Sequence, residues 1–201
     1  SYIPHVPFNR EEIKDHIFFI KTPAAWNMII SAAFIKKYAL RFQETKNTND
    51  LYFTYAVLNL AQKITVVDMV LVHYRMGTGS NLQSGNDESP LDFCRAFLKL
   101  KKLLIKKGVF DEVKRGYISL YLTNFEYHMF TLQSVQSFKV LYDYFKENGR
   151  QELELDCHDV ECFCNKERFK LLCDVVDSDS MSGYLYSQLK REKNKLENER
   201  E

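Results

Sequence analysis

Residues 51–62 are apolar on almost every side of the helix that they predict, and the polar triplet Asn47-Thr48-Asn49 stands directly before them. Polar residues of this kind cap helix N-termini, and a helix without a broad polar face is expected to be buried. Asp50 then lies in the first turn, where unpaired backbone N–H groups and the helix dipole favour a carboxylate. The pattern therefore predicts an acid held on a rigid, buried helix.

The residues after this helix are rich in β-branched and aromatic side chains, at 64–67 and again at 70–75. Such side chains fit a pleated sheet, so both runs predict extended strands. The second run ends at Arg75 and is followed by a Gly/Ser-rich loop, residues 77–81, that contains Ser80. Glycine lets backbone N–H groups approach a ligand closely, and a guanidinium pairs well with phosphate.

Two shorter helices are predicted nearer the start of the chain. Asn9 predicts a capped helix, because a Glu follows it three residues later. Ser31 predicts a second helix that runs to about Ala39, with residues 26–30 extended. A helix that begins at Trp26 fits the same apolar spacing and is the alternative.

From residue 90 onward apolar residues recur at helical spacing. Caps and stops predict helices from Ser89-Pro90 to Gly108, from about 111 to 130, from Ser134 to Asn148-Gly149, and from Asn165 to about 176. Three amphipathic helices with short connections predict a small bundle. Residues 185–201 are highly charged and predict a solvent-exposed helix.

Charge and composition narrow the function classes. The 28 Lys and Arg residues balance 27 Asp and Glu residues, so the net charge of +1 gives no reason to expect a nucleic-acid partner. No apolar run approaches the roughly 18 residues of a membrane-spanning helix. The lysines at 99, 101, 102, 106 and 107 predict a basic helix face. It is either a solvated surface or a contact for a membrane or an anionic acceptor.

The five cysteines, an odd number, do not form the pattern of a secreted disulfide framework. Cys157, Cys162 and Cys164 gather in one short segment, yet their spacing lacks the paired C-x-x-C of zinc sites. We expect free thiols in a reducing compartment, with a zinc-binding module as a remote alternative.

Several motifs occur together in the first part of the chain, over roughly residues 15–85. Their combined order resembles the C-terminal half of the catalytic domain of glycosyltransferase family 2, inverting enzymes with a GT-A fold. The motifs that carry the resemblance are Ala25-Trp26-Asn27, a helix around Phe34 to Tyr38, Leu40-Arg41-Phe42, Asn49-Asp50, and His73-Tyr74-Arg75 with Ser80.

The resemblance implies a role for each matching residue. Asp50 would be the catalytic base that takes a proton from the acceptor hydroxyl. Arg75 and Ser80 would bind the donor diphosphate and stabilise it as it leaves. Trp26 would line the acceptor or donor pocket, together with Asn49, which replaces the first acid of the commoner Glu-Asp pair.

The resemblance also implies the fold class: α+β, mostly α-helical, with the C-terminal part of a GT-A-like domain and its short β element followed by a helical bundle. Residues 1–86 would be the catalytic half-domain, and residues 87–201 the helical extension. The family's metal-binding Asp-x-Asp triplet does not precede Trp26, and the sequence begins with Ser. We therefore expect a fragment that lacks the donor-binding half and is inactive alone.

The full enzyme would transfer a sugar from a nucleotide-diphosphate donor to a glycan or lipid-linked acceptor in bacterial-type surface polysaccharide synthesis. It would use a divalent Mg or Mn ion, with no metal bound to this fragment. It would act in the cytoplasm, including the inner face of the membrane. The surface left by the missing half predicts self-association.

A non-catalytic helical interaction module is the alternative from another class. The two hypotheses differ at Asp50. An enzyme requires Asp50 in a cleft shared with Arg75, whereas a scaffold requires it bonded to the N–H groups of its own helix.

Overall fold

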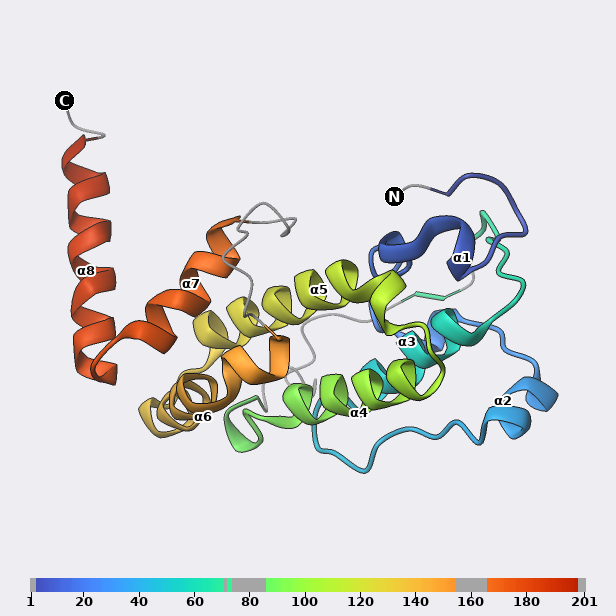
Figure 1. The fold of residues 1–201 in the computed structure, drawn as a ribbon, viewed down its shortest axis with the longest axis horizontal. Helices are drawn as coiled ribbons and strands as arrows, with labels where there is room; N and C mark the ends of the chain where they lie inside the picture. Colours follow the sequence, from blue (N-terminus) through green and yellow to red (C-terminus); the bar gives the residue numbers. More distant parts are fainter. Residues whose placement is uncertain (1–2, 71, 74–85, 155–165, 199–201) are drawn as a thin grey trace.

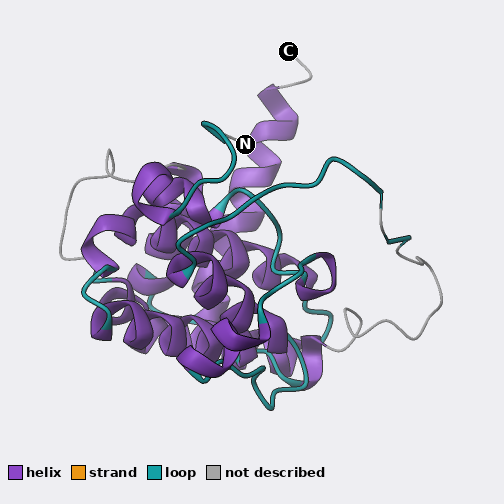
Figure 2. Cartoon of the chain, turned by 90° about the vertical axis from the view of Figure 1, so that its right-hand side faces the viewer, coloured by secondary structure: helices purple, strands orange, loops and turns teal. Residues whose placement is uncertain are grey.

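The computed structural model describes residues 3–70, 72–73, 86–154 and 166–198. Regular structure in this part of the chain is helical (Figure 2). Its α-helices are α1 (Arg10–Ile13), α2 (Ala32–Tyr38), α3 (Asn49–Leu60), α4 (Asp92–Lys106), α5 (Phe110–Thr131), α6 (Val135–Leu153), α7 (Lys166–Asp177) and α8 (Met181–Asn198). Two 3₁₀ helices, η1 (Lys14–Phe18) and η2 (Ala25–Asn27), lie near the start.

The molecule is elongated (Figure 1). The N-terminal elements, α1 to α3, lie at one end, and α6 to α8 lie at the other. Helices α4 and α5 form an antiparallel pair between the two ends, and α8 projects away from the body. Gly108 connects α4 to α5 with φ +67, a left-handed conformation in which a side chain is strained.

Local capping signals account for several helix ends. The Asn9 side chain accepts the Glu11 N–H at 2.8 Å, and Glu12 accepts the Asn9 N–H at 2.8 Å. Ser134 caps α6 by accepting the Ser137 N–H. Helix α2 begins directly after Ser31, as predicted, although the Ser31 side chain makes no capping hydrogen bond. Residues 28–31 lie outside any helix, so the alternative of one helix beginning at Trp26 is wrong. The predicted extended segment at 26–30 is wrong at its start, because Trp26 and Asn27 belong to η2.

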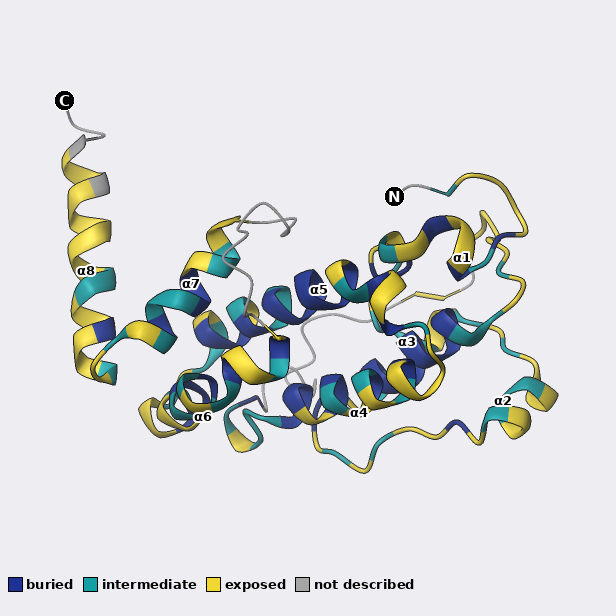
Figure 3. Cartoon of the chain, in the orientation of Figure 1, coloured by how far each residue is buried: buried dark blue, intermediate teal, exposed yellow. Residues whose placement is uncertain are grey.

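One continuous apolar core runs through both halves of the chain, from Phe8 to Tyr184. Helix α3 is buried from Leu51 to Asn59, as its uniform apolar pattern predicted (Figure 3). Aromatic rings fill the centre between α4, α5 and α6. Phe97 stacks on Tyr121 with ring centroids 4.4 Å apart, for example. Stacked and edge-on ring pairs stabilise such a core beyond their burial alone.

The described residues of the two predicted strands, at 64–67 and 70–75, form no strand. Among them, the β pairing is a single antiparallel bridge between Phe8 and Ile64. The segment that follows is exposed, with Val70 at 78% and Met69 at 69% of full accessibility. Strand propensity acts through packing against neighbouring strands, and this part of the structure provides none. Residues 71 and 74–85 lie outside the described residues.

The predicted stop of α6 at Asn148-Gly149 is wrong, because the helix continues to Leu153. Gly149 is buried inside it, and a Cβ there would lie 3.2 Å from the Leu172 side chain of α7. The glycine thus allows two helices to pack closely. The helix ends instead at Glu154, in a left-handed conformation with φ 51.

Helix α8 starts at Met181 and is largely exposed (Figure 3). Its first turns pack on the body through Tyr184, which is 3% exposed. Arg191 pairs with Asp174 of α7, adding a second attachment. The predicted exposed C-terminal helix is therefore present, with its beginning four residues earlier than expected at 185.

The mostly helical fold is confirmed, whereas the GT-A-like β element is not shown. The core crosses residue 86 through packing of α3 on α4 and of η1 on α5. The division into residues 1–86 and 87–201 stays a prediction about function.

Candidate functional site

Asp50 lies in the first turn of α3, as predicted, and its side chain is half-buried. Thr48 precedes the helix in a left-handed conformation and makes no side-chain cap. The Asp50 carboxylate instead interacts with its own backbone N–H and with the backbone N–H of Ala25 in η2. The acid therefore joins the start of α3 to the turn that carries Trp26.

That turn, residues 21–26, lies against α3 through further contacts. The Tyr55 hydroxyl donates to the Lys21 carbonyl at 3.3 Å, and the Thr54 hydroxyl donates to the Pro23 carbonyl at 3.4 Å. Lys21 Nζ folds back on the turn and donates to two of its backbone carbonyls. Three residues in the first half of α3, at positions 50, 54 and 55, thus contact a segment about thirty residues away in sequence.

The electrostatics of the two charged side chains are coupled. Burial raises the pKa of the Asp50 carboxyl, while the backbone N–H groups and the Lys21 charge act to lower it. Burial lowers the pKa of the Lys21 ammonium to about 8, and the Asp50 charge acts to raise it. Burial and then the Asp50 charge raise the pKa of Tyr55. A half-buried acid with a raised pKa close to a half-buried base with a lowered pKa is typical of functional sites.

The other predicted pocket residues lie at the same end of α3. Trp26 is 52% exposed, so it is a surface aromatic and not a core residue. Asn49 is the first residue of α3, and it is exposed beside Asp50. The structure thus brings together three predicted residues, at positions 26, 49 and 50. The predicted donor-binding residues Arg75 and Ser80 lie outside the described residues.

Sequence reasoning missed Lys21. No motif marks it, because its importance comes from a contact across the fold. The signals available were the chain break at Thr22-Pro23 and the position directly before the Trp-Asn motif. Neither signal indicates that a lysine would be half-buried next to the carboxylate of α3.

A second cluster of titratable groups lies between α4, α5 and α6. The hydroxyls of Tyr121 and Tyr144 both donate to Glu152. Cys94 lies nearby, and burial raises the pKa of its thiol well above the usual value. A thiol held neutral is a poor nucleophile. This cluster is a buried polar network that supports packing.

The predicted basic face of α4 is not one uniform surface. Lys101 is only 12% exposed and pairs with Glu154 at 2.7 Å. The Lys99 ammonium lies 4.3 Å from the ring centre of Tyr52, and that of Lys107 lies 5.2 Å from Tyr38. These lysines cover aromatic rings while their charged ends reach water.

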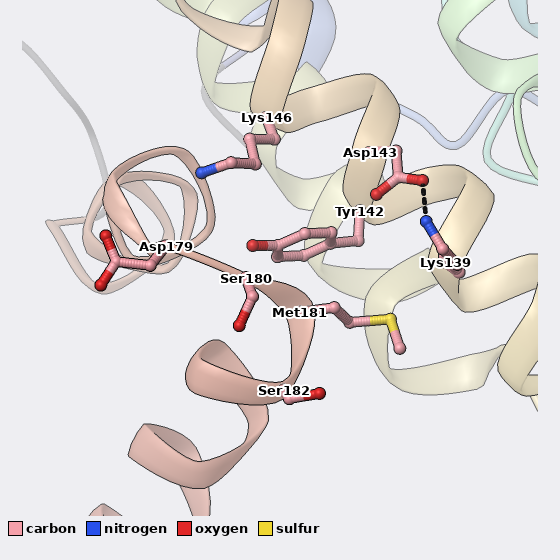
Figure 4. A pocket seen from close by; sticks show the side chains of 8 residues that line it. All are labelled: Lys139, Tyr142, Asp143, Lys146, Asp179, Ser180, Met181 and Ser182. Carbon is pink, nitrogen blue, oxygen red and sulfur yellow. Dashed lines mark hydrogen bonds and ion pairs between the residues drawn. The ribbon is translucent and has the colours of Figure 1, made fainter.

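A shallow groove between α6 and the start of α8 is lined by eight residues (Figure 4). Lys139 pairs with Asp143 across one turn of α6. Lys146 donates to the carbonyls of Val176 and Ser178. Ser180 accepts the Gly183 N–H at 3.1 Å. These polar groups serve the corner between helices, so the groove is a weaker candidate than the Asp50 cluster.

Within residues 3–70, 72–73, 86–154 and 166–198, no group of three or more His, Cys, Asp or Glu side chains is placed to hold a metal ion. Two cysteines in these ranges, Cys94 and Cys173, are free thiols. The segment with Cys157, Cys162 and Cys164 lies outside them. No helix in the described part combines the length and apolarity needed to cross a membrane.

The chain matches no protein-family model, and comparisons with curated proteins and with solved structures find no relative.

Proposed function

We propose that this chain is the C-terminal part of the catalytic domain of an inverting glycosyltransferase, joined to a helical extension. The observation that carries the proposal is the Asp50 cluster. A carboxyl with a raised pKa lies at the exposed end of a rigid, buried helix, next to a turn with a surface tryptophan. These are the properties of a general base beside a sugar-binding aromatic.

In the proposed reaction, Asp50 accepts the proton of an acceptor hydroxyl. The hydroxyl oxygen forms a bond to the anomeric carbon of the donor sugar, and the bond from that carbon to the nucleotide diphosphate breaks. Attack opposite the leaving group inverts the anomeric centre. Arg75 and Ser80 are proposed to stabilise the charge on the diphosphate. Trp26 and Asn49 are proposed to line the acceptor side.

A base works best when its pKa lies near the pH at which it acts. Burial raises the pKa of Asp50 toward that range, while Lys21 and two backbone N–H groups limit the rise. The Asp50 carboxylate is therefore more basic than an exposed aspartate.

The divalent metal expected with the donor does not fit the described residues, because they place no three metal-ligating side chains together. We propose that the donor and its metal bind to a preceding half-domain that is not part of these 201 residues. A cytoplasmic location and a glycan or lipid-linked acceptor belong to the same proposal.

A non-catalytic interaction module is the second candidate. One observation favours it: the Asp50 carboxylate is engaged by its own N–H and that of Ala25, as expected for a purely structural acid. The projecting helix α8, with Tyr186 and Leu189 each 70% exposed, would then provide the contact surface.

Transfer assays separate the two candidates. The test uses the proposed full-length protein, in which a donor-binding half would precede this chain, with a panel of nucleotide sugars and Mg or Mn. We expect Asp50→Asn to lower kcat by about 10²–10⁴-fold, the usual contribution of general base catalysis, with donor affinity unchanged. Asp111→Asn is the matched control, because Asp111 also lies in the first turn of a helix but is exposed.

Wild-type turnover by Asp50→Asn would refute the role of the base. Failure of the wild-type protein to bind any donor would support the interaction module. Self-association, proposed from exposed side chains such as Ile29 and Val70, is tested by sedimentation over a range of concentrations. A monomer at every concentration would contradict it.

A further inference from the structure

The turn of residues 21–26 places Trp26 at the end of α3, and one lysine ties this turn together. Lys21 Nζ donates to the carbonyl of Thr22 at 2.8 Å and to the carbonyl of Ala24 at 2.9 Å. Hydrogen bonds from a charged donor are stronger than those between neutral groups. The side chain therefore closes the turn on itself just before η2.

Helix α3 holds the same turn from outside. Tyr55 donates to the Lys21 carbonyl and Thr54 donates to the Pro23 carbonyl. The backbone N–H of Ala25 lies close enough to the Asp50 carboxylate to act on its pKa. These contacts fix the backbone at three points. Lys21 adds internal bonds between those points, so the turn meets α3 as one rigid unit.

A lysine is a costly choice at this position. Its ammonium is half-buried, and burial lowers its pKa to about 8. A methionine would fill similar space without desolvating a charge. The lysine supplies several N–H donors that reach backbone carbonyls and a positive charge beside Asp50, and an apolar side chain has neither.

We propose that Lys21 is a positioning residue: it fixes the turn of residues 21–26 on α3, so that Trp26 and Asp50 stay adjacent where the acceptor binds. Its role in transfer rests on the proposed function. Its role in holding Trp26 rests on the contacts alone and can be measured without any substrate.

Trp26 is the only tryptophan of the chain, so all tryptophan fluorescence comes from this turn. We expect Lys21→Met to increase acrylamide quenching of Trp26 toward the value of the unfolded chain and to lower its anisotropy. The far-UV circular dichroism should not change. Lys21→Arg should restore the wild-type values, because a guanidinium also donates to carbonyls. Lys36→Met, at an exposed position on α2, is the control and should have no effect.

Equal quenching in Lys21→Met and wild type would overturn the positioning role, and so would a Lys21→Arg variant as mobile as Lys21→Met. Should Lys21→Met lose the wild-type circular dichroism, Lys21→Gln replaces it, because the amide keeps a donor without the charge. Acrylamide quenching of Lys21→Gln that lies between the quenching of Lys21→Arg and that of the unfolded chain then supports the positioning role. Quenching of Lys21→Gln equal to that of the wild type overturns it.

Kinetics of the full-length protein test the link to transfer. Misplacing a substrate-positioning group by about 1 Å can lower the rate up to about 100-fold. We therefore expect Lys21→Met to lower kcat/KM for the acceptor by raising the acceptor KM, while the donor KM is unchanged. Lys21→Arg should restore most of the wild-type kcat/KM for the acceptor. Asp50→Asn, in contrast, lowers kcat.

The two proposals fail in different ways. If Asp50→Asn keeps wild-type turnover, the proposed function is wrong, and fluorescence still decides whether Lys21 holds Trp26. If Asp50→Asn is inactive but Lys21→Met has the wild-type acceptor KM, the function stands and the positioning role in transfer is wrong.

Discussion

Replacing Gly116 by alanine should displace the element that supports the candidate site. Gly116 lies in α5, where its N–H donates to the Asp15 side chain at 2.8 Å. A Cβ at this position would lie 2.3 Å from the Asp15 carbonyl oxygen. Ordinary contact begins at 3.4 Å, so η1 would have to move by about 1 Å. The obstacle is backbone, which cannot rotate away as a side chain can.

The magnitude follows from three contributions. Overpacking of a well-packed site costs about 1–3 kcal/mol. Losing the hydrogen bond to Asp15 costs about 0.5–1.5 kcal/mol. Alanine gains about 1 kcal/mol over glycine inside a helix. We expect a net loss of about 2 kcal/mol, which lowers Tm by about 4–8 °C for a chain of this length.

The assay is thermal unfolding followed by circular dichroism, with Gly183→Ala as the matched control. Gly183 is exposed in α8, and a Cβ there meets only the Ser180 hydroxyl at 3.3 Å. That variant should gain about 0.4–1 kcal/mol, because the unfolded chain loses conformational freedom. The two substitutions therefore have opposite predicted signs.

The Gly116 displacement should also reach the site. Phe18 of η1 packs on Tyr55 with ring centroids 5.5 Å apart, and Tyr55 binds the Lys21 carbonyl. Trp26 fluorescence should change in Gly116→Ala and not in Gly183→Ala. A Tm for Gly116→Ala at or above that of the wild type would refute the close approach of η1 and α5.

Three further predictions concern stability. Folding raises the pKa of Asp50, so its ionisation opposes folding as pH rises through the folded pKa. Asp50→Asn should therefore be more stable than wild type at neutral pH, with no gain below the ordinary pKa of 3.8, as measured by urea unfolding; a loss at neutral pH would contradict this. Burial lowers the pKa of His128 in the folded state. The stability that the neutral imidazole contributes is therefore fully present above pH 6.5 and declines as the pH falls toward the folded pKa. His128→Gln should reduce that acid sensitivity, and an unchanged pH profile of Tm would count against it. Leu172 is fully buried against Gly149, and Leu172→Ala should lower the unfolding free energy by about 2–5 kcal/mol, whereas a loss under 1 kcal/mol would show a loosely packed α7.

Much of the secondary structure could be predicted from residue order. The apolar pattern and polar triplet placed α3 and put Asp50 in its first turn. The helical spacing of apolar residues placed α5, in which residues such as Val113, Tyr117 and Phe125 are buried. These predictions succeed because helix formation depends on local spacing and caps. The predicted end of α6 at Gly149 was wrong, because this glycine makes room for the Leu172 side chain of α7 and does not terminate the helix.

The candidate site could be predicted only in part. Positions 26, 49 and 50 were identified by their motifs, and the structure brings them to one end of α3. The burial of Lys21, its bonds to the turn, and the opposed pKa shifts of Lys21 and Asp50 had no counterpart in the sequence pattern. The roles of Arg75 and Ser80 stay predictions.

The sequence by itself determined most of the α-helical segments and which of their faces are apolar, because spacing and caps act over a few residues. Only the tertiary structure decided that the turn at 21–26 lies on α3 and that η1 packs closely against α5 at Gly116. Only the tertiary structure, likewise, shows that the described residues after Ile64, such as Val66 and Val70, are exposed. Burial, pKa and close contact depend on neighbours distant in sequence, and those neighbours are set by how the helices pack.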